Sequence, residues 1–438
     1  MRKNHYDVVI IGGGASGLAA AIELGIEAPE LSVAVLEKND EPGRKIRATG
    51  SGRCNITNTN AEGYDEILKF FGKIGLVTRA YDNGLVYPYS ESAADVAELL
   101  ITSAEELGAE IITGAEVTGI ERDSDRSGSG AFSIAYSSGK GKSAEVVTAA
   151  KVILSSGGKA GPTYGTTGDG YKLARNFGHT IVTPVPVLTS IECGGWSEDK
   201  SRHSRGPNGI MLAGTRTRGV VKLFKFGNDK PAPGTLISSE AGEIQFTKYG
   251  LSGICVFNLT RHMRYDRSAG ESLGNFEISA DLYPDGDAEK FLKERRDNAF
   301  PGEKTGQVLR SLLKSNIASY VLGRADSIKL FKEPGEPEMA DKLLADLSDS
   351  DIRAIACAVH HLTFKPERIR GWKEAQATSG GVALDEIDEA TCESKLASGL
   401  YITGELADRD FPCGGYNLSN AWVTGLKAAR AIACKPLS

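Results

Sequence analysis

The hydrophobic positions at the start of the chain predict a strand, a helix and a second strand in quick succession. Residues Tyr6 to Ile11 form a short apolar run, Gly12 to Gly14 interrupt it, and Ala15 to Glu27 show helical spacing. A second apolar run, Ser32 to Leu36, ends at Glu37. Together these segments have the roughly 30-residue length of a β-α-β unit. The pattern therefore predicts the building block of a parallel α/β sheet.

The pattern next predicts a capped helix followed by further strands. Ser92, with Asp95 three residues later, is typical of a helix start, and Gly108 is typical of its end. Beyond this helix we expect a strand over 110–120, polar turns over 123–130 and 137–143, and a strand in the apolar run KVILSSGG.

In the middle of the chain the pattern changes twice. From Val187 to Ile278, short apolar segments alternate with Gly, Pro and Asn turns, which indicates antiparallel β structure. From Asp287 to Leu362 the spacing is helical, amphipathic and charged. After Trp372 the chain returns to glycine-rich strand, turn and helix patterns. We therefore expect one α/β domain that is interrupted by two insertions.

Composition narrows the class of protein. At 438 residues the chain is too long for one ordinary core, and its 40% hydrophobic and 25% charged content is typical of a soluble globular protein. A net charge of -6 argues against a nucleic-acid partner. The seven cysteines are never closer than 21 residues, which excludes C-x-x-C motifs and favours a reducing cytoplasm. Apolar runs are too short for a membrane helix, so no membrane association is expected.

Gly12-x-Gly14-x-x-Gly17 lies between the first predicted strand and helix, as in a dinucleotide-binding fingerprint. Gly12 allows the tight turn, Gly14 lets the backbone approach a pyrophosphate, and Gly17 lets the helix pack on its strand. The free N–H groups at the helix start would face the phosphates. Glu37, 20 residues after Gly17, is placed to bind a ribose diol. A carboxylate there would repel a 2′-phosphate, which favours FAD or NAD over NADP.

The C-terminal region distinguishes FAD from NAD. The apolar segment Ser398 to Asp408 contains Gly404-Glu405, a strand end of the kind that flavoproteins use to place a carboxylate on the ribityl chain. A helix is predicted to start near Asn417 and Leu418. The positive end of this helix would stabilise negative charge on a reduced flavin, so FAD is the expected cofactor.

Six segments together resemble one flavoprotein family. They are GGGASGLAAA, RKIRATGSGRCNITN, GPTYGTTGDGYKLARNFGH, TSGGV, ESKLASGLYITGELAD and CGGYNLSNAWVTG. In these motifs the chain is similar, over nearly its whole length, to the BaiN-type (3-dehydro-bile-acid reductase-like) NAD(P)/FAD-dependent oxidoreductases. The resemblance implies a Rossmann-like FAD/NAD(P)-binding domain with an inserted β-barrel that carries a small helical insertion. The expected bounds are 1–188 and 372–438 for the FAD domain, 189–280 and 346–371 for the barrel, and 281–345 for the helices.

The resemblance also implies which residues bind non-covalent FAD. The pyrophosphate would lie on the fingerprint glycines, the adenosine at Glu37 and Val117, the ribityl chain at Glu405, and the flavin along the segment after Arg44. The full expected set is Gly12, Gly14, Ala15, Ser16, Gly17, Glu37, Lys38, Arg44, Lys45, Thr49, Gly50, Ser51, Gly52, Arg53, Cys54, Asn55, Val117, Ser156, Gly157, Gly404, Glu405, Gly415, Asn417 and Leu418.

The sequence does not identify a catalytic acid or base. Tyr164, His179 and Tyr416 are candidates, although packing or a helix-end position explains each of them as well. Two positions depart from the family pattern, Phe411 in place of Gly and Ile254 in place of Pro, and either could reshape the substrate pocket. No metal site is expected, because the adjacent His360 and His361 cannot share an ion on a helix.

Cys54, inside the segment ATGSGRCNITN, is open to three interpretations. A low-pKa thiol beside Arg53 is one, but Cys54 has no resolving cysteine nearby. A glycan acceptor at Asn55 is a second, and it conflicts with a buried loop in a cytoplasmic protein. The third, a cofactor loop in which Cys54 is structural or contacts the flavin, is the one we expect.

The expected activity is NAD(P)H-dependent, flavin-mediated hydride transfer to an activated C=C or C=N of a small organic substrate held between the FAD domain and the barrel. No second dinucleotide fingerprint occurs, so NAD(P)H would bind transiently. One alternative is an oxidase of small amines or aminoketones that uses O2. Another is a non-catalytic redox sensor or RNA- or partner-binding protein, with a basic face over Lys200 to Lys230. Oligomeric state is left open.

Overall fold

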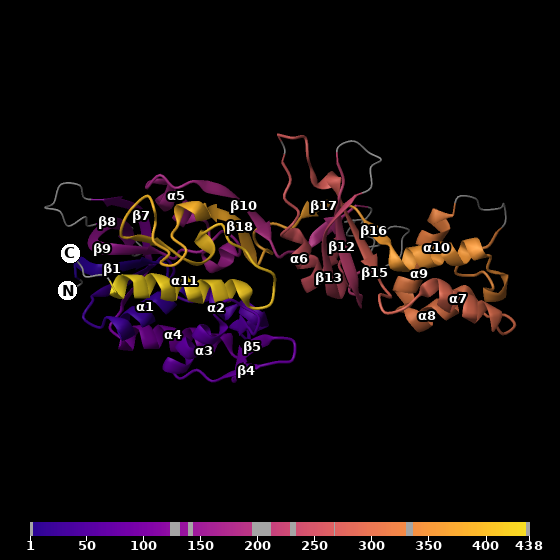
Figure 1. The fold of residues 1–438 in the computed structure, drawn as a ribbon, viewed down its shortest axis with the longest axis horizontal. Helices are drawn as coiled ribbons and strands as arrows, with labels where there is room; N and C mark the ends of the chain where they lie inside the picture. Colours follow the sequence, from indigo (N-terminus) through magenta and orange to yellow (C-terminus); the bar gives the residue numbers. More distant parts are fainter. Residues whose placement is uncertain are drawn as a thin grey trace. The chain divides into compact units, whose positions relative to one another are not determined.

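The computed structural model describes residues 3–122, 132–138, 143–194, 212–227, 234–266, 268–329 and 336–434. The chain forms two compact units, Met1–Val187 with Trp372–Ser438 and Leu188–Gly371, whose elements are labelled in Figure 1. The predicted turn over 123–130 lies outside the described residues, as does most of the turn over 137–143. No helix in these ranges is both long enough and apolar enough to span a membrane.

The first unit is built on a parallel sheet with the strand order β6-β2-β1-β9-β19. Val8 and Ile10 pack into the core on one face of this sheet, and Val9 and Ile11 pack into the core on the other, because successive side chains of a strand alternate. Burial on both faces explains the continuous apolar runs. The bounds are β1 His5–Ile11, β2 Val33–Glu37, β6 Glu110–Thr113, β9 Ser143–Leu154 and β19 Leu400–Ile402.

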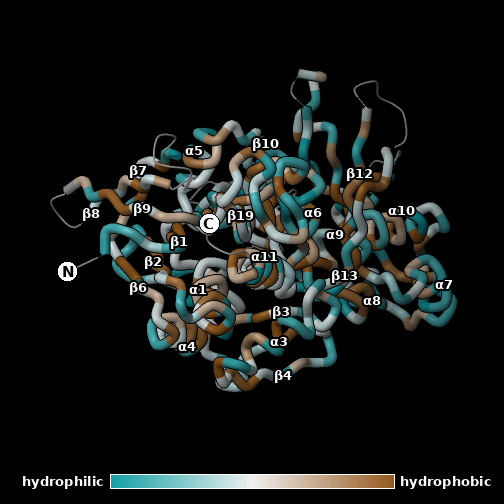
Figure 2. Tube along the Cα trace, turned by 60° about the vertical axis from the view of Figure 1, so that its left-hand side comes forward, coloured by the Kyte–Doolittle hydropathy of each residue, from teal (hydrophilic) through white to brown (hydrophobic). Residues whose placement is uncertain are grey.

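Helices cover one face of the sheet. Figure 1 shows α1 and α11 side by side, and a Cβ on Gly425 would lie 2.3 Å from the Ser16 carbonyl oxygen, so these helices touch backbone to backbone. Ser92 caps α4 by accepting a hydrogen bond from the Asp95 amide, as predicted. Hydrophobic residues gather along β1, β2 and α1 (Figure 2). The bounds are α1 Ala15–Glu27, α2 Arg44–Arg47, α3 Tyr64–Lys73, α4 Ala93–Glu106 and α11 Tyr416–Ala433.

An antiparallel extension covers the other face, and it corrects one prediction. The strand expected over 110–120 is two strands, because Gly114 takes a left-handed φ of 65° and turns the chain. As a result β6 joins the parallel sheet and β7 pairs with β8. The remaining bounds are β3 Thr57–Asn58, β4 Thr78–Ala80, β5 Leu85–Pro88, β7 Ala115–Arg122, β8 Phe132–Ser138, α5 Asp169–Arg175, β10 Ile181–Val187 and β18 Ala377–Val382.

The second unit contains an antiparallel sheet in the order β16-β15-β12-β13-β14-β11-β17. Antiparallel pairing was predicted here, but helix α6 (Ile254–Thr260) was not. Among the described strands the pairing follows an open path from β16 to β17, so closure into a barrel stays a prediction. The strand bounds are β11 Ile191–Cys193, β12 Arg216–Lys225, β13 Thr235–Phe246, β14 Gly250–Ser252, β15 Phe276–Asp281, β16 Leu362–Phe364 and β17 Pro366–Ile369.

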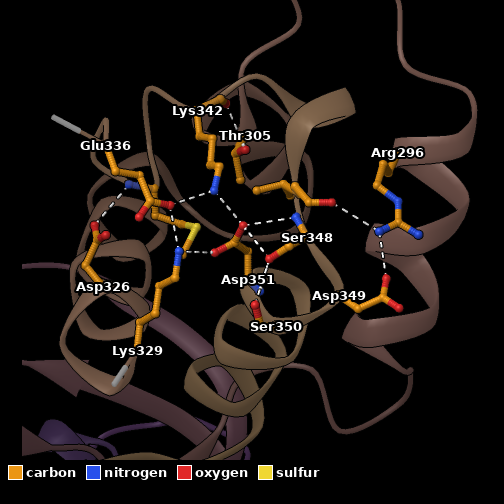
Figure 3. Close-up of polar contacts among 12 residues, drawn as sticks. Arg296, Thr305, Asp326, Lys329, Glu336, Lys342, Ser348, Asp349, Ser350 and Asp351 are labelled. Carbon is orange, nitrogen blue, oxygen red and sulfur yellow. Dashed lines mark hydrogen bonds and ion pairs between the residues drawn. The ribbon is translucent and has the colours of Figure 1, made fainter. Parts of the chain in front are cut away.

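The helical part of the second unit surrounds a buried carboxylate (Figure 3). Asp351 has a fully buried side chain and lies 2.6 Å from Lys342 Nζ and 2.9 Å from Lys329 Nζ. Burial alone would raise the pKa of Asp351, but hydrogen bonds from Lys342 and Lys329 outweigh it and hold the pKa well below its usual range. The helices are α7 Ala288–Asp297, α8 Thr305–Leu312, α9 Ser315–Ile328 and α10 Asp349–His360.

Candidate cofactor site

A cavity with about 200 Å³ of water-accessible space opens where the parallel strands of the first unit end. Gly12 to Ser16 follow β1, Glu37 ends β2, Ser155 to Gly157 follow β9, and Glu405 follows β19; all of them line the cavity. Open α/β sheets bind ligands at this edge, because the loops there connect strands to helices and leave a crevice between them. The fold therefore brings together segments that lie more than 350 residues apart in the chain.

Two of the fingerprint glycines, Gly12 and Gly17, lie where a side chain would clash, and the pyrophosphate contact predicted for Gly14 stays a prediction. A Cβ on Gly12, whose φ is 107°, would lie 2.6 Å from the Ser155 carbonyl oxygen. A Cβ on Gly17 would lie 2.0 Å from the Gly12 carbonyl oxygen, so α1 can pack here only without a side chain. At Gly14 a Cβ would meet nothing within 4 Å, and Gly14, Ala15 and Ser16 line the cavity. The start of α1 thus faces open space with free N–H groups, which suits a pyrophosphate.

Glu37 is buried and fixes the adjacent loop. One carboxylate oxygen accepts a 2.8 Å hydrogen bond from the Gly13 amide, and the other accepts bonds from the backbone and side chain of Asn39. Oε2, which accepts only the Gly13 amide, keeps a further lone pair that could accept from a ribose hydroxyl. Val117, predicted at adenine, lines the same cavity. Contact of Glu37 and Val117 with adenosine stays a prediction.

The other end of the cavity carries charges of both signs. Glu405 accepts a 2.7 Å bond from Lys45 Nζ and a 2.8 Å bond from the Thr378 amide. Asn417 and Leu418, in the first turn of α11, also line the cavity. The positive end of an 18-residue helix therefore points toward this space, where it stabilises negative charge.

These residues fit FAD. Ser156 lines the cavity, and its buried hydroxyl has no hydrogen-bond partner among the described residues, although buried hydroxyls are normally paired. A ligand with polar groups would supply that partner. Gly157 also lines the cavity, while Gly404 (φ 65°) brings the backbone against Ser16 so closely that a Cβ would lie 2.9 Å from the Ser16 hydroxyl.

The segment from Arg44 to Asn55, which begins with α2, lines the cavity only in part. Arg44, Lys45 and Thr49 line it, whereas residues 50–55 do not, so the predicted contact of Gly50, Ser51, Gly52, Arg53, Cys54 and Asn55 with the flavin stays a prediction. Arg53 instead stacks over Tyr87, and Asn55 accepts a hydrogen bond from the Val86 amide. Gly415 does not line the cavity either, and begins α11 at a φ of 98°.

Cys54 is completely buried in the hydrophobic core that packs under α1 and α11. Burial raises the pKa of its thiol to about 11, so the thiol is protonated at neutral pH. This environment is that of a structural cysteine and not of a reactive one.

We expect Cys54→Ser to retain bound FAD and its reducibility, with a modest loss of thermal stability because a hydroxyl replaces a buried thiol. Flavin absorbance of the purified variant and its bleaching by dithionite check this. A variant that holds FAD normally but turns over no substrate would show that the thiol takes part in the chemistry.

The three catalytic candidates lie in different places in the structure. Tyr164 lines the cavity, but Tyr416 lies in a different, smaller pocket and His179 lines neither. His179 is buried, with Nδ1 2.9 Å from Glu386 and Nε2 2.8 Å from the Ser394 hydroxyl. This Ser-His-Glu arrangement resembles a hydrolytic triad, yet Ser394 is itself buried and its oxygen accepts two backbone N–H groups. His179 therefore lies outside the cofactor cavity, and a catalytic role for it stays a prediction.

Several cavity residues escaped the sequence analysis. Asn39 and Gln376 line the cavity but belong to no motif, and Thr166, Asp169 and Gly170 belong to the TTGDG stretch whose residues received no role. Only the glycine density of that stretch could have indicated a ligand-facing turn.

In the basic region expected over Lys200 to Lys230, residues 212–227 are described and the rest lie outside the described residues. Within β12, Arg216 pairs with Glu243 and Lys225 pairs with Glu271, so these two cations are locally compensated. Among the described residues no group of three or more His, Cys, Asp or Glu side chains could hold a metal ion.

Comparison with known proteins identifies the family of the chain. The model of the HI0933-like protein Rossmann domain family matches residues 6–69 and 60–431. The chain is 32% identical to the 3-dehydro-bile acid delta(4,6)-reductase of Clostridium scindens, over 98% of this chain and 99% of that protein. It is 24% identical to the ribosomal RNA dihydrouridine synthase of Haemophilus influenzae, over 98% and 99% of the two chains.

Among solved structures, the 3-ketosteroid delta1-dehydrogenase of Sterolibacterium denitrificans has a TM-score of 0.50 at 12% identity, covering 98% of this chain and all of that one, which shows a shared fold. The resemblance predicted from the motifs is confirmed by the family match and by the 32% identical relative. The chain belongs to the HI0933-like Rossmann-domain family and is a FAD-dependent oxidoreductase.

Proposed function

We propose that this enzyme uses NAD(P)H to reduce a carbon–carbon double bond conjugated to a carbonyl group in a small organic molecule. The observation that carries the proposal is the cavity end formed by Lys45, Glu405 and the start of α11. FAD bound in this cavity would supply hydride transfer, and the protein supplies binding, orientation and charge. The charges of Lys45 and Glu405 offset each other, so the α11 N-terminus is the group that favours extra negative charge at that end, which a two-electron-reduced cofactor carries.

The names of two relatives support the choice of substrate class. A delta(4,6)-reductase of a 3-oxo bile acid and a synthase of dihydrouridine both saturate a C=C bond in conjugation with a carbonyl. Such a bond accepts hydride at its distal carbon and a proton next to the carbonyl. Tyr164 lines the cavity with a phenol that could deliver this proton, and it is the one catalytic candidate from the sequence that lies there.

The electron donor is tested by anaerobic mixing of the FAD-loaded enzyme with NADH and, separately, with NADPH. We expect one of them to bleach the yellow flavin band within seconds. If neither bleaches it while dithionite does, the NAD(P)H-dependent activity is wrong. Rapid recolouring by air, together with oxygen uptake on aminoketones, would favour the oxidase alternative instead.

A further inference from the structure

A second feature of the first unit, the segment Gly161–Asp169 (the strap), lies across the cofactor cavity from the loop that follows β2. From the strap, Tyr164, Gly165, Thr166 and Asp169 line the cavity. From the loop, Glu37, Lys38, Asn39 and Arg44 line the same cavity. The two walls belong to segments more than 110 residues apart in the chain, so only tertiary contacts hold them together.

Polar contacts join these walls. Lys38 Nζ donates a 2.6 Å hydrogen bond to the Thr167 hydroxyl and forms an ion pair with Asp169. Arg44 donates a 3.3 Å bond to the Thr163 carbonyl. These side chains are a quarter to nearly half exposed, which puts the contacts at the rim of the cavity and not in its interior. Burial of Asp169 is outweighed by its bonds to Lys38 and Thr167, so its pKa is lowered and the carboxylate stays charged at neutral pH.

The strap is also anchored at its start, where the Gly161 amide donates a 2.9 Å hydrogen bond to the Trp372 carbonyl, but most of it is not buried. Of its nine residues only Gly161 is buried, and Thr163, Tyr164, Thr167 and Asp169 are exposed. Left-handed glycines lie near both ends, Gly161 with a φ of 73° and Gly168 with a φ of 85°. A segment with few buried apolar contacts opens locally at small free-energy cost. The contacts with Lys38 and Arg44 therefore decide how often it opens.

We propose that the strap retains FAD, and that the ion pair of Lys38 with Asp169 is the clasp that closes it over the cofactor. Lys38 then acts through Asp169 and not by binding the cofactor itself, which differs from the direct FAD contact that the family resemblance implies. The proposal depends on FAD occupying the cavity and is independent of the substrate and of the electron donor.

The experiment measures the rate of FAD release from the holoenzyme, by recovery of FAD fluorescence after dilution, in low and high salt. We expect Asp169→Asn to release FAD about two- to fivefold faster in low salt, the range for loss of a surface ion pair. We also expect release from the unmodified enzyme to accelerate with salt and release from the variant to respond less. The double variant Lys38→Glu with Asp169→Lys should restore slow release.

The matched control is Glu27→Gln, because Glu27 forms a comparable pair with Lys73 at 46% exposure, against 45% for Asp169, and lies outside the cavity. Its release rate should equal that of the unmodified enzyme. An unchanged rate in Asp169→Asn would overturn the clasp. A slower rate would overturn it as well, since it would mean that a freed Lys38 binds FAD directly. If Glu27→Gln accelerates FAD release as much as Asp169→Asn does, the effect comes from a general change in charge, and the clasp is overturned.

Discussion

Replacing Gly17 with alanine is expected to give a protein that carries no FAD and melts at a lower temperature. The added Cβ would lie 2.0 Å from the Gly12 carbonyl oxygen and 2.7 Å from the Ser155 hydroxyl. Neither contact can be relieved without moving α1 away from β1, and overpacking of this kind costs about 1–3 kcal/mol or more. Moving α1 also displaces the N–H groups that face the cavity. The ratio of flavin to protein absorbance and the thermal midpoint check both effects.

The matched control is the same substitution at Gly72 in α3, where a Cβ would meet nothing within 4 Å. Because alanine is the better helix former, Gly72→Ala should keep full FAD and gain about 0.5–1 kcal/mol of stability. A Gly17→Ala protein with a full complement of FAD would contradict the close packing on which the predicted cofactor site depends.

Asp351→Asn is expected to destabilise the second unit by about 3 kcal/mol, the typical result of removing one partner from a buried ion pair. The variant leaves Lys329 and Lys342 with Glu336 as their shared acid, and it replaces a buried charge that both ammonium groups contact. Faster hydrogen exchange in α9 and α10 would locate the loss. FAD content should not change, since every residue that lines the cofactor cavity belongs to the other unit.

The pH dependence of the stabilisation by Asp351 follows from the direction of its pKa shift. The pKa of Asp351 is lower in the folded protein than in the unfolded chain, so its stabilisation is complete above about pH 5 and is lost as the pH falls below ~4. Asp351→Asn should therefore flatten the acid side of the stability curve. Asp349→Asn is the control, because Asp349 lies on the same helix in an exposed pair with Arg296 and should matter much less. Equal losses in the two variants would contradict the role given to the buried carboxylate.

The parts of the fold that depend on nearby residues could be predicted from the sequence. Local spacing predicts the β-α-β unit and the cap at Ser92. It also predicts Gly12 and Gly17 as positions of close approach, where a side chain would clash. Helix α6 could not be predicted, because its sequence ICVFNLT is apolar and β-branched and has the composition of a strand.

The parts of the site that depend on distant residues could not be predicted. Asp169 pairs with Lys38 across 131 positions, and Glu405 with Lys45 across 360, and no local pattern indicates either partner. The burial of Cys54 could not be predicted from the sequence either. Cys54 follows an exposed arginine in the sequence, yet it lies in the core with a raised pKa, in a segment where Ser51 and Cys54 both have a left-handed φ of 57°.

The oxidative half-reaction, in which the reduced flavin passes its electrons to a substrate, shows directly whether this enzyme reduces a C=C bond conjugated to a carbonyl. The holoenzyme is photoreduced without air and mixed with cyclohex-2-enone, a 3-oxo-4,6-diene steroid or a uridine-containing RNA, with cyclohexanone as the saturated control. We expect the flavin band to return with the steroid or the enone, together with the saturated product, and we expect cyclohexanone and RNA to leave the enzyme reduced. If the RNA is the only one of these compounds that restores the flavin band, the substrate is a nucleic acid and not a small molecule. Return of the flavin band only with O2 would contradict reduction of a conjugated C=C bond.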